Sequence, residues 1–209
     1  MHEPKLTPML RQYHHIKKEH RDMLLLFRLG DFYELFYDDA VTASRELGLT
    51  LTSRHENVPL CGVPFHAVEN YIVKLIKRGY KVAICDQMED PKFSKSIVKR
   101  EVVQIITPGT ITSLNMLDSK ANNYLASICL VNDRIGISFV DISTAEFIST
   151  ELLSAGDIEN EIVKFKPSEI IVSEKIFKDE KLMKSLGADK NRLVSKYNDW
   201  VFEPEYARQ

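Results

Sequence analysis

The sequence is poor in cysteine, and its three cysteines stand far apart. Cys61, Cys85 and Cys129 form no CxxC pair, which excludes the usual spacing of a zinc site or a thiol–disulfide redox motif. Cys85 and Cys129 lie in apolar runs, so we expect buried, reduced thiols. No stretch approaches the roughly 18 apolar residues of a membrane-spanning helix, and MHEPKLTPML lacks the apolar core of a secretory signal. We therefore expect a cytoplasmic location.

An excess of positive charge is also missing. The chain has 28 Lys and Arg against 30 Asp and Glu, a net charge of −2. Residues 1–115 carry 16 basic against 14 acidic side chains, a balance of +2, and residues 116–209 carry 12 against 16, a balance of −4. A domain that wraps nucleic acid by charge alone is usually far more basic. Any DNA contact is therefore expected to be small, or to form within a larger assembly.

The phosphate-binding loop of P-loop nucleotidases is absent as well. No segment of the sequence matches GxxxxGK[ST]. This chain by itself therefore cannot be an ATP-hydrolysing motor of that class, and we expect no enzyme activity from it.

The first half of the chain alternates helix and strand signals. Thr7-Pro8 is a capping hydroxyl followed by proline and predicts a helix over about 8–20. The apolar run 23–29, bounded by Gly30, predicts a buried strand. Further predicted elements are a helix from Asp38 to Leu47, a strand at LTLT, a turn-rich VPLCGVPFH, a helix at about 67–78, and strands at KVAICDQ and EVVQIITPG. This alternation predicts an α/β domain that ends near residue 110.

The second half has a different pattern. NYLASICLV, RIGISFVDIS and AEFISTELL predict three strands in quick succession, with a hairpin turn at Asn132-Asp133. A helix at about 157–165, the strand EIIVSE, a helix at 176–186 and a strand near RLVS follow. Three antiparallel strands followed by α-β-α-β resemble the ribonuclease H-like topology. The polar segment NMLDSKANN between the halves is interpreted as a linker.

The segment RLGDFYELFYDDA is unusual on physical grounds. Gly30 permits a sharp turn after the buried strand, and two aromatic residues, Phe32 and Tyr33, follow at once. These aromatic side chains can pack in the core or protrude. Asp31, Glu34 and Asp38, at i, i+3 and i+7, could line one helical face as a metal site, although a solvated acidic face is the simpler interpretation.

GDFYELFYDDA resembles the mismatch-recognition signature of the MutS family, whose Phe-x-Glu element falls on Phe32 and Glu34. The resemblance extends through PLCGVPFHAVENYIVKLIKRGYKVAICDQMEDP, VVQIITPGT and the closing EYARQ, in the same order. It covers essentially the whole chain. The loop SRHEN (53–57) is shorter than in some relatives, which puts DNA contacts from that loop in doubt.

The resemblance implies two domains and a set of partners. It implies a mixed-sheet α/β mismatch-recognition domain over about 1–115 and a ribonuclease H-like connector domain over 116–209. In this family the full-length protein is a dimeric ATPase that uses ATP and magnesium, and the connector meets the partner MutL. This fragment is expected to hold no cofactor or metal of its own, to bind mismatched double-stranded DNA, and to associate with the nucleoid.

The physics of mismatched DNA agrees with this implied role. A mismatched step stacks poorly, so an apolar ring pushed in from the minor groove unstacks and kinks it at the lowest cost. Phe32 has the flat apolar face that such a wedge needs. Glu34 lies two residues on and, in an extended segment, points to the same side, where it can reach a base edge. A carboxylate among phosphates adds no affinity by charge, so we interpret Glu34 as a discriminator.

Basic side chains downstream are candidate phosphate contacts. Most lie in the polar connection between KVAICDQ and EVVQIITPG, and the candidates are Lys92, Lys95, Lys99, Arg100 and, more weakly, Arg54. Phosphate contacts would hold the wedge in register without reading sequence. A solvated loop is the alternative interpretation.

Two other classes of function stay open. Asp141 lies near where ribonuclease H-like nucleases carry a metal-binding carboxylate, and Glu169 and Glu174 are further acids in that half. Two-metal chemistry needs several converging carboxylates, and no second aspartate lies in a matching apolar strand. The other class is a pure protein-interaction module, which suits residues 116–209 better than residues 1–115.

Overall fold

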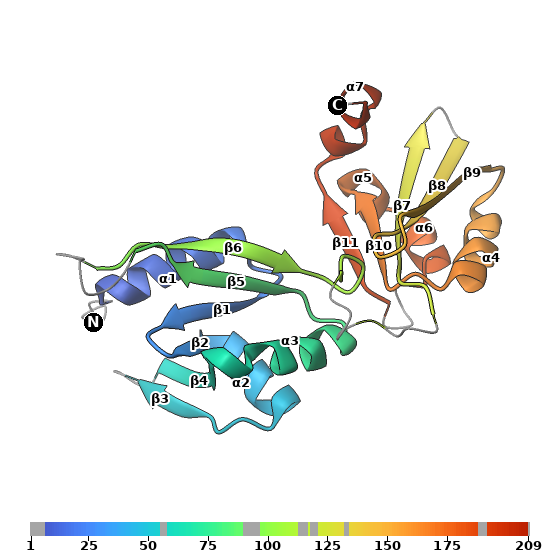
Figure 1. The fold of residues 1–209 in the computed structure, drawn as a ribbon. Helices are drawn as coiled ribbons and strands as arrows, with labels where there is room; N and C mark the ends of the chain where they lie inside the picture. The colour runs from blue at the N-terminus through green and yellow to red at the C-terminus, as the bar shows by residue number, and fades with distance from the viewer. Residues whose placement is uncertain are drawn as a thin grey trace. The chain divides into compact units, whose positions relative to one another are not determined.

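The computed structural model describes residues 7–54, 58–89, 97–112, 117, 121–131, 134–187 and 192–208. The chain divides into two compact units, Met1–Thr107 and Pro108–Gln209. Each has its own mixed sheet and helices, as the predicted α/β class requires (Figure 1). The predicted domain boundary at 115–116 lies outside the described residues.

The first unit is built on a six-stranded sheet in the order β3-β4-β2-β1-β5-β6. Among its described strands only β1 and β5 pair in parallel, and all other neighbours are antiparallel. Its elements are α1 (Pro8–Glu19), β1 (Leu24–Leu29), β2 (Phe32–Phe36), α2 (Tyr37–Leu47), β3 (Thr52–Arg54), β4 (Val58–Pro64), η1 (Phe65–Ala67), α3 (Val68–Lys77), β5 (Val82–Gln87) and β6 (Arg100–Ile106).

Helices cover both faces of this sheet. The Thr7 side chain caps α1, and Leu10, Tyr13 and Ile16 pack from that helix onto one face of β1 and β2. The helices α2 and α3 contact each other and β4 on the opposite face. Tyr13 is fully buried because its ring meets Phe27 and Phe36 edge to face, which fixes α1 against the sheet.

The second unit carries a five-stranded sheet in the order β11-β10-β7-β8-β9. β7, β8 and β9 are antiparallel, whereas β10 pairs in parallel with both β7 and β11. Its elements are β7 (Tyr124–Val131), β8 (Arg134–Asp141), β9 (Glu146–Leu152), α4 (Ala155–Phe165), β10 (Glu169–Ser173), α5 (Glu174–Phe177), α6 (Glu180–Ser185), β11 (Val194–Tyr197), η3 (Asp199–Phe202) and α7 (Pro204–Ala207). The predicted succession of three antiparallel strands and then α-β-α-β is confirmed, except that the single helix expected at 176–186 is two short helices, α5 and α6.

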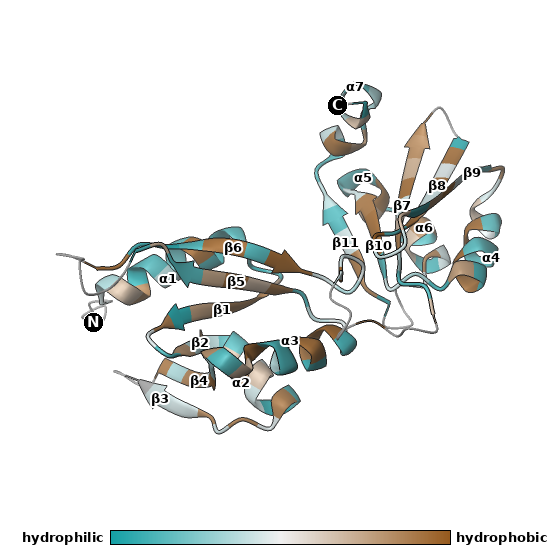
Figure 2. Cartoon of the chain, in the orientation of Figure 1, coloured by the Kyte–Doolittle hydropathy of each residue, from teal (hydrophilic) through white to brown (hydrophobic). Residues whose placement is uncertain are grey.

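The helices of the second unit bury one face of its sheet. Ile158 and Ile162 of α4 and Ile176 of α5 pack on the inward side chains of β7, β8 and β10. Ser154 and Asp157 form a capping box that begins α4. Apolar residues concentrate along the inner strands β1 and β10, while the helices alternate apolar and polar residues (Figure 2). No described helix is both long enough and apolar enough to cross a membrane.

Candidate nucleic-acid interface

The β1–β2 hairpin sets the direction of the Phe32 side chain. Gly30 has φ +58°, a left-handed conformation that glycine adopts without strain, and it turns the chain between the strands. Leu29 then pairs with Phe32, and Phe27 with Glu34. Because side chains alternate along a strand, Phe32 and Glu34 share one face.

Burial separates the two aromatic residues of the signature. Phe32 is 46% exposed, whereas the neighbouring Tyr33, on the other face, is 3% exposed. Tyr33 is therefore the core aromatic residue and Phe32 the protruding one. Glu34 is half-buried beside it. The sequence had left both interpretations open for this pair, and the structure assigns one to each residue.

Gly62 of β4 lies beneath the two side chains. It pairs with Glu34, and a Cβ placed on it would lie 3.5 Å from Glu34 Cγ and 3.8 Å from Phe32 Cδ1. The phenyl ring and the carboxylate therefore lie side by side over a residue that has no side chain. The site is an exposed apolar ring next to a carboxylate on a paired strand.

The acidic residues of this segment do not form a metal site. Residues 32–36 are a strand, so Asp31, Glu34 and Asp38 have no common helical face. Among the described residues no group of three His, Cys, Asp or Glu side chains could hold a metal ion. The simpler interpretation of exposed acids suits Asp31 and Asp38, which are both exposed.

The structure places only part of the predicted basic cluster. Lys92 and Lys95 lie outside the described residues, as does the side chain of Arg54 at the end of β3. Lys99 is exposed, and its Nζ lies 2.5 Å from Glu101 Oε1. That ion pair raises the pKa of Lys99. Lys99 therefore keeps its charge, and a phosphate would compete with Glu101 for its exposed ammonium group.

Arg100 is placed differently, because its side chain is buried. Its Nε donates to the Arg28 carbonyl at 2.7 Å, and its Nη1 donates to Gln12 Oε1 at 3.0 Å and to the Val98 carbonyl at 2.9 Å. The guanidinium carbon also lies 5.0 Å from the centre of the Phe27 ring. Burial lowers the pKa of Arg100. With these internal partners Arg100 ties α1 to the sheet, and we leave it out of the proposed phosphate contacts.

The cysteines of the first unit are buried thiols. Burial raises the pKa of Cys61 to about 11 and that of Cys85 to about 12. Both thiols are free, as is that of Cys129. Such thiols stay protonated at neutral pH and are poor nucleophiles.

The acids of the second unit have separate structural partners. Asp141 is buried and accepts hydrogen bonds from Asn123 N at 3.0 Å and from Ser143 Oγ at 2.6 Å. Burial alone would raise the pKa of Asp141, but these hydrogen bonds outweigh it and lower that pKa. Glu169 accepts from Gly109 N and Ser195 Oγ, and Glu174 pairs with Lys196. The nuclease alternative therefore gains no converging carboxylates from the described residues.

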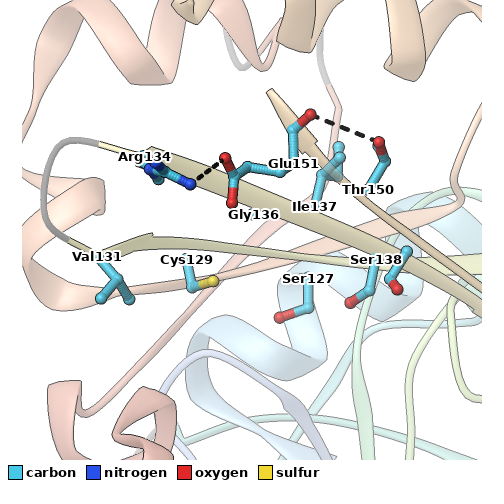
Figure 3. A pocket seen from close by; sticks show the side chains of 10 residues that line it. Ser127, Cys129, Val131, Arg134, Gly136, Ile137, Ser138, Thr150 and Glu151 are labelled. Atoms are coloured by element: carbon cyan, nitrogen blue, oxygen red, sulfur yellow. Dashed lines mark hydrogen bonds and ion pairs between the residues drawn. The ribbon is translucent and has the colours of Figure 1, made fainter. Parts of the chain in front are cut away.

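The outer face of the second sheet, opposite its helices, has a hollow of about 850 Å³ (Figure 3). Small side chains from neighbouring strands form its floor, among them Ser127, Cys129 and Ser138. Arg134 and Glu151 form an ion pair at 2.9 Å within it. This face is open to solvent, and the described residues place no group of metal-binding side chains on it.

Comparisons with known proteins agree with both units. Residues 7–115 match the family described as MutS domain I, and residues 123–209 match MutS domain II. The chain therefore belongs to the MutS family. It is 49% identical over 211 aligned positions to the DNA mismatch repair protein MutS of Acetivibrio thermocellus and 50% identical over 212 to that of Alkaliphilus oremlandii. A third relative, the DNA mismatch repair protein MutS of Methanococcoides burtonii, is 45% identical over 213 aligned positions.

These matches cover the chain but not the relatives. They take in 98%, 97% and 98% of this chain, in the same order, and 24% of each relative. The chain thus spans about a quarter of the length of these curated proteins and corresponds to their first two domains.

Proposed function

We propose that the first unit recognises mismatched or unpaired bases in duplex DNA, as part of post-replicative mismatch repair. Phe32 enters the duplex from the minor groove and stacks at the weakened step, and Glu34 hydrogen-bonds the displaced base. One observation supports the proposal most directly, namely that an exposed phenyl ring adjoins a carboxylate on one face of a paired strand.

The energetics favour defective DNA over paired DNA. Unstacking a base step costs on the order of a few kcal/mol, and the cost falls where pairing is already lost. A protein that inserts one ring therefore reads deformability and needs no base-sequence code. Lys99, with Lys92, Lys95 and Arg54, would add phosphate contacts that set the register of the wedge.

A binding comparison tests this function. The full-length protein is titrated with one-base-loop, G·T and fully paired duplexes of one sequence, alongside Phe32→Ala and Phe147→Ala. Phe147 is also an exposed phenylalanine, 67% exposed on β9, so its variant controls for loss of an exposed ring. Phe32→Ala is expected to bind all three duplexes equally, and Phe147→Ala to retain the wild-type preference. An unchanged preference in Phe32→Ala would contradict the wedge.

We also propose that the second unit meets MutL, as the family resemblance implies. A sheet buried on one face and open on the other leaves surface for a partner. In a competition assay, excess of this 209-residue chain is expected to displace the full-length protein from purified MutL. Unchanged binding at saturating chain would contradict the proposal.

The dimeric ATPase activity belongs, in this proposal, to the part of the protein beyond these two units. The full-length protein would bind ATP and magnesium there and would dimerise there. Purified full-length protein is expected to hydrolyse ATP, whereas the 209-residue chain is not. Hydrolysis that co-purifies with the chain through several columns would overturn that division.

A further inference from the structure

The face of the β1–β2 hairpin opposite Phe32 carries a cluster of four side chains, Arg28, Tyr33, Phe65 and Asp86, which we name the Arg28 cluster. Arg28 pairs with Tyr33, so both side chains point away from the Phe32 face. Phe65 reaches them from η1, directly after β4. The sequence pattern assigned no role to Arg28 or Phe65.

The guanidinium of Arg28 is the centre of this cluster. Its carbon lies 3.6 Å from the centre of the Phe65 ring and 5.3 Å from that of Tyr33. Its Nε donates to the carbonyl of Gly30, at the tip of the hairpin. One planar side chain thus joins the turn that precedes Phe32 to an aromatic ring from another element.

Two further contacts hold the same tip. The Phe65 amide donates to the Asp31 carbonyl at 2.8 Å, and Tyr33 O–H donates to Asp86 Oδ2 at 3.1 Å, which reaches β5. Burial and the neighbouring Asp86 carboxylate raise the pKa of Tyr33, so its hydroxyl stays a donor at neutral pH. The tip is therefore tied from its reverse side to η1 and β5.

A wedge needs such support. Inserting a ring between stacked bases exerts a force on the turn that carries the ring. If that turn deforms, part of the binding free energy is lost to the deformation. We propose that Arg28 is a positioning residue for mismatch recognition. It holds the Gly30–Asp31 turn through the Phe65 stack and the Gly30 hydrogen bond, so that Phe32 enters DNA without bending the hairpin. This inference rests on the proposed function of Phe32.

The alternative role for Arg28 is a direct phosphate contact, and the two roles predict different variants. A lysine keeps the charge for a phosphate but loses the planar stack and the Nε donor. If Arg28 positions the turn, Arg28→Lys should weaken the preference for mismatched over paired duplex. If Arg28 contacts a phosphate, Arg28→Lys should keep that preference. At Phe65, leucine keeps apolar bulk without a ring, whereas tyrosine keeps the ring.

The experiment measures the ratio of mismatch to paired-duplex affinity in full-length protein. Arg28→Lys and Phe65→Leu are expected to lower this ratio about two- to fivefold, the worth of one exposed cation–π stack. Phe65→Tyr, which keeps the aromatic ring, is expected to keep the wild-type ratio. Arg78→Lys is the matched control and is expected to keep the wild-type ratio. Arg78 is an exposed arginine at the end of α3, and it pairs with Glu46 of α2.

Two further readouts separate positioning from general loss of structure. Amide hydrogen exchange in residues 28–36 is expected to speed up in Arg28→Lys and Phe65→Leu, while exchange in α1 and α3 stays unchanged. The salt dependence of binding by Arg28→Gln is expected to match wild type, because no phosphate contact is lost. A slope reduced by about one charge, with an unchanged mismatch ratio, would assign Arg28 to a phosphate and overturn the inference.

Phe32→Ala in the same series distinguishes the possible failures. If Phe32→Ala loses the mismatch preference while Arg28→Lys and Phe65→Leu retain it, the positioning role alone is overturned. If Phe32→Ala also retains the preference, the wedge is wrong and the positioning role falls with it.

Discussion

Gly62 faces Glu34 across the β2–β4 pairing, and a Cβ on Gly62 would lie 3.5 Å from Glu34 Cγ. That distance is an ordinary van der Waals contact, so one methyl group fits beneath the carboxylate. The same Cβ would lie 3.8 Å from Phe32 Cδ1. A larger side chain must therefore displace the ring or the carboxylate.

This relationship predicts opposite results for two substitutions. Gly62→Ala is expected to keep the preference for mismatched over paired duplex, because its methyl group fits. Gly62→Val suits a strand better than Gly62→Ala does, but it adds two further methyl groups under Phe32 and Glu34, so it is expected to lose most of the preference. Titration of G·T and paired duplexes measures both. Equal preference in the two variants would show that the space above Gly62 does not matter.

The fold should tolerate loss of the Phe32 ring but not loss of Phe36. Both lie on one face of β2, yet Phe36 is fully buried and Phe32 is 46% exposed. Truncating a core phenylalanine costs about 3–5 kcal/mol. Phe36→Ala is expected to lower the free energy of unfolding by that amount, and Phe32→Ala by less than about 1 kcal/mol. Urea denaturation of both variants measures this. A large loss in Phe32→Ala would make Phe32 a core residue.

The sequence predicted the helices of the first unit better than the strands that carry its site. The helix expected at 8–20 is Pro8–Glu19, and the one expected at 67–78 is Val68–Lys77. By contrast, VPLCGVPFH was predicted to be turn-rich, and most of it is β4. Glycine and proline favour turns in isolation, but pairing with β2 on one side and β3 on the other outweighs that local preference.

The sequence predicted only the part of the site that depends on side-chain alternation along a single strand. Alternation along an extended segment was enough to place Phe32 and Glu34 on the same side. The support from Gly62, Arg28 and Phe65 depends on register between strands distant in sequence, and no local pattern reveals that register. Arg100 shows the same limit, because a basic residue among lysines gave no sign that its guanidinium would be buried.

Asp141 should stabilise the second unit at neutral pH and lose that effect in acid. Its pKa is lowered in the folded state, so the folded protein binds its proton less readily than the unfolded chain does. The stabilisation is therefore complete above the unfolded value of about 3.9 and is lost as pH falls through the lower folded value. Asp141→Asn is expected to cost about 1.5–3 kcal/mol at pH 7, the worth of hydrogen bonds to a charged group.

Urea denaturation of wild type and Asp141→Asn from pH 7 to pH 2.5 measures this effect. The difference between the two proteins is expected to narrow below about pH 4. A difference that stays constant across the range would show that the charge of Asp141 contributes nothing. A metal-dependent assay of DNA cleavage by the native wild-type protein is expected to find no activity. DNA cleavage that Asp141→Asn abolishes would support the nuclease alternative.

DNA binding by the 209-residue chain alone should be weak and sensitive to salt. The net charge is −2, and among the proposed phosphate contacts the described residues include the side chain of Lys99 alone. Affinity is expected to lie in the range of non-specific binding, with Kd about 1–100 µM at physiological salt. Fluorescence anisotropy between 50 and 200 mM salt, roughly the range over which such binding falls steeply, measures both properties. Submicromolar affinity at physiological salt would mean that contacts outside the proposed set dominate.

Glu34 could discriminate mismatched from paired DNA, or it could be only an acidic surface residue. The two roles predict different effects of Glu34→Ala on duplex affinity. If Glu34 only repels phosphates, Glu34→Ala in the full-length protein will tighten binding to every duplex equally. If it discriminates, its charge opposes docking on paired DNA, where stacked bases offer no accessible donor. On a mismatch, the displaced base shares a hydrogen bond with the carboxyl group, which offsets that repulsion.

A hydrogen bond to a charged group contributes about 1.5–3 kcal/mol, or roughly tenfold to a hundredfold in affinity. Glu34→Ala is therefore expected to bind paired duplex as well as wild type or better, and mismatched duplex no better, so that the ratio shrinks. Glu34→Gln keeps a hydrogen-bonding side chain without the charge and should retain mismatch affinity while gaining affinity for paired DNA. Asp38→Asn removes an exposed acid of the same segment and controls for charge alone, because it should tighten both substrates equally. If Glu34→Ala behaves like Asp38→Asn, with the ratio unchanged, Glu34 is not a discriminator and Phe32 alone reads the mismatch.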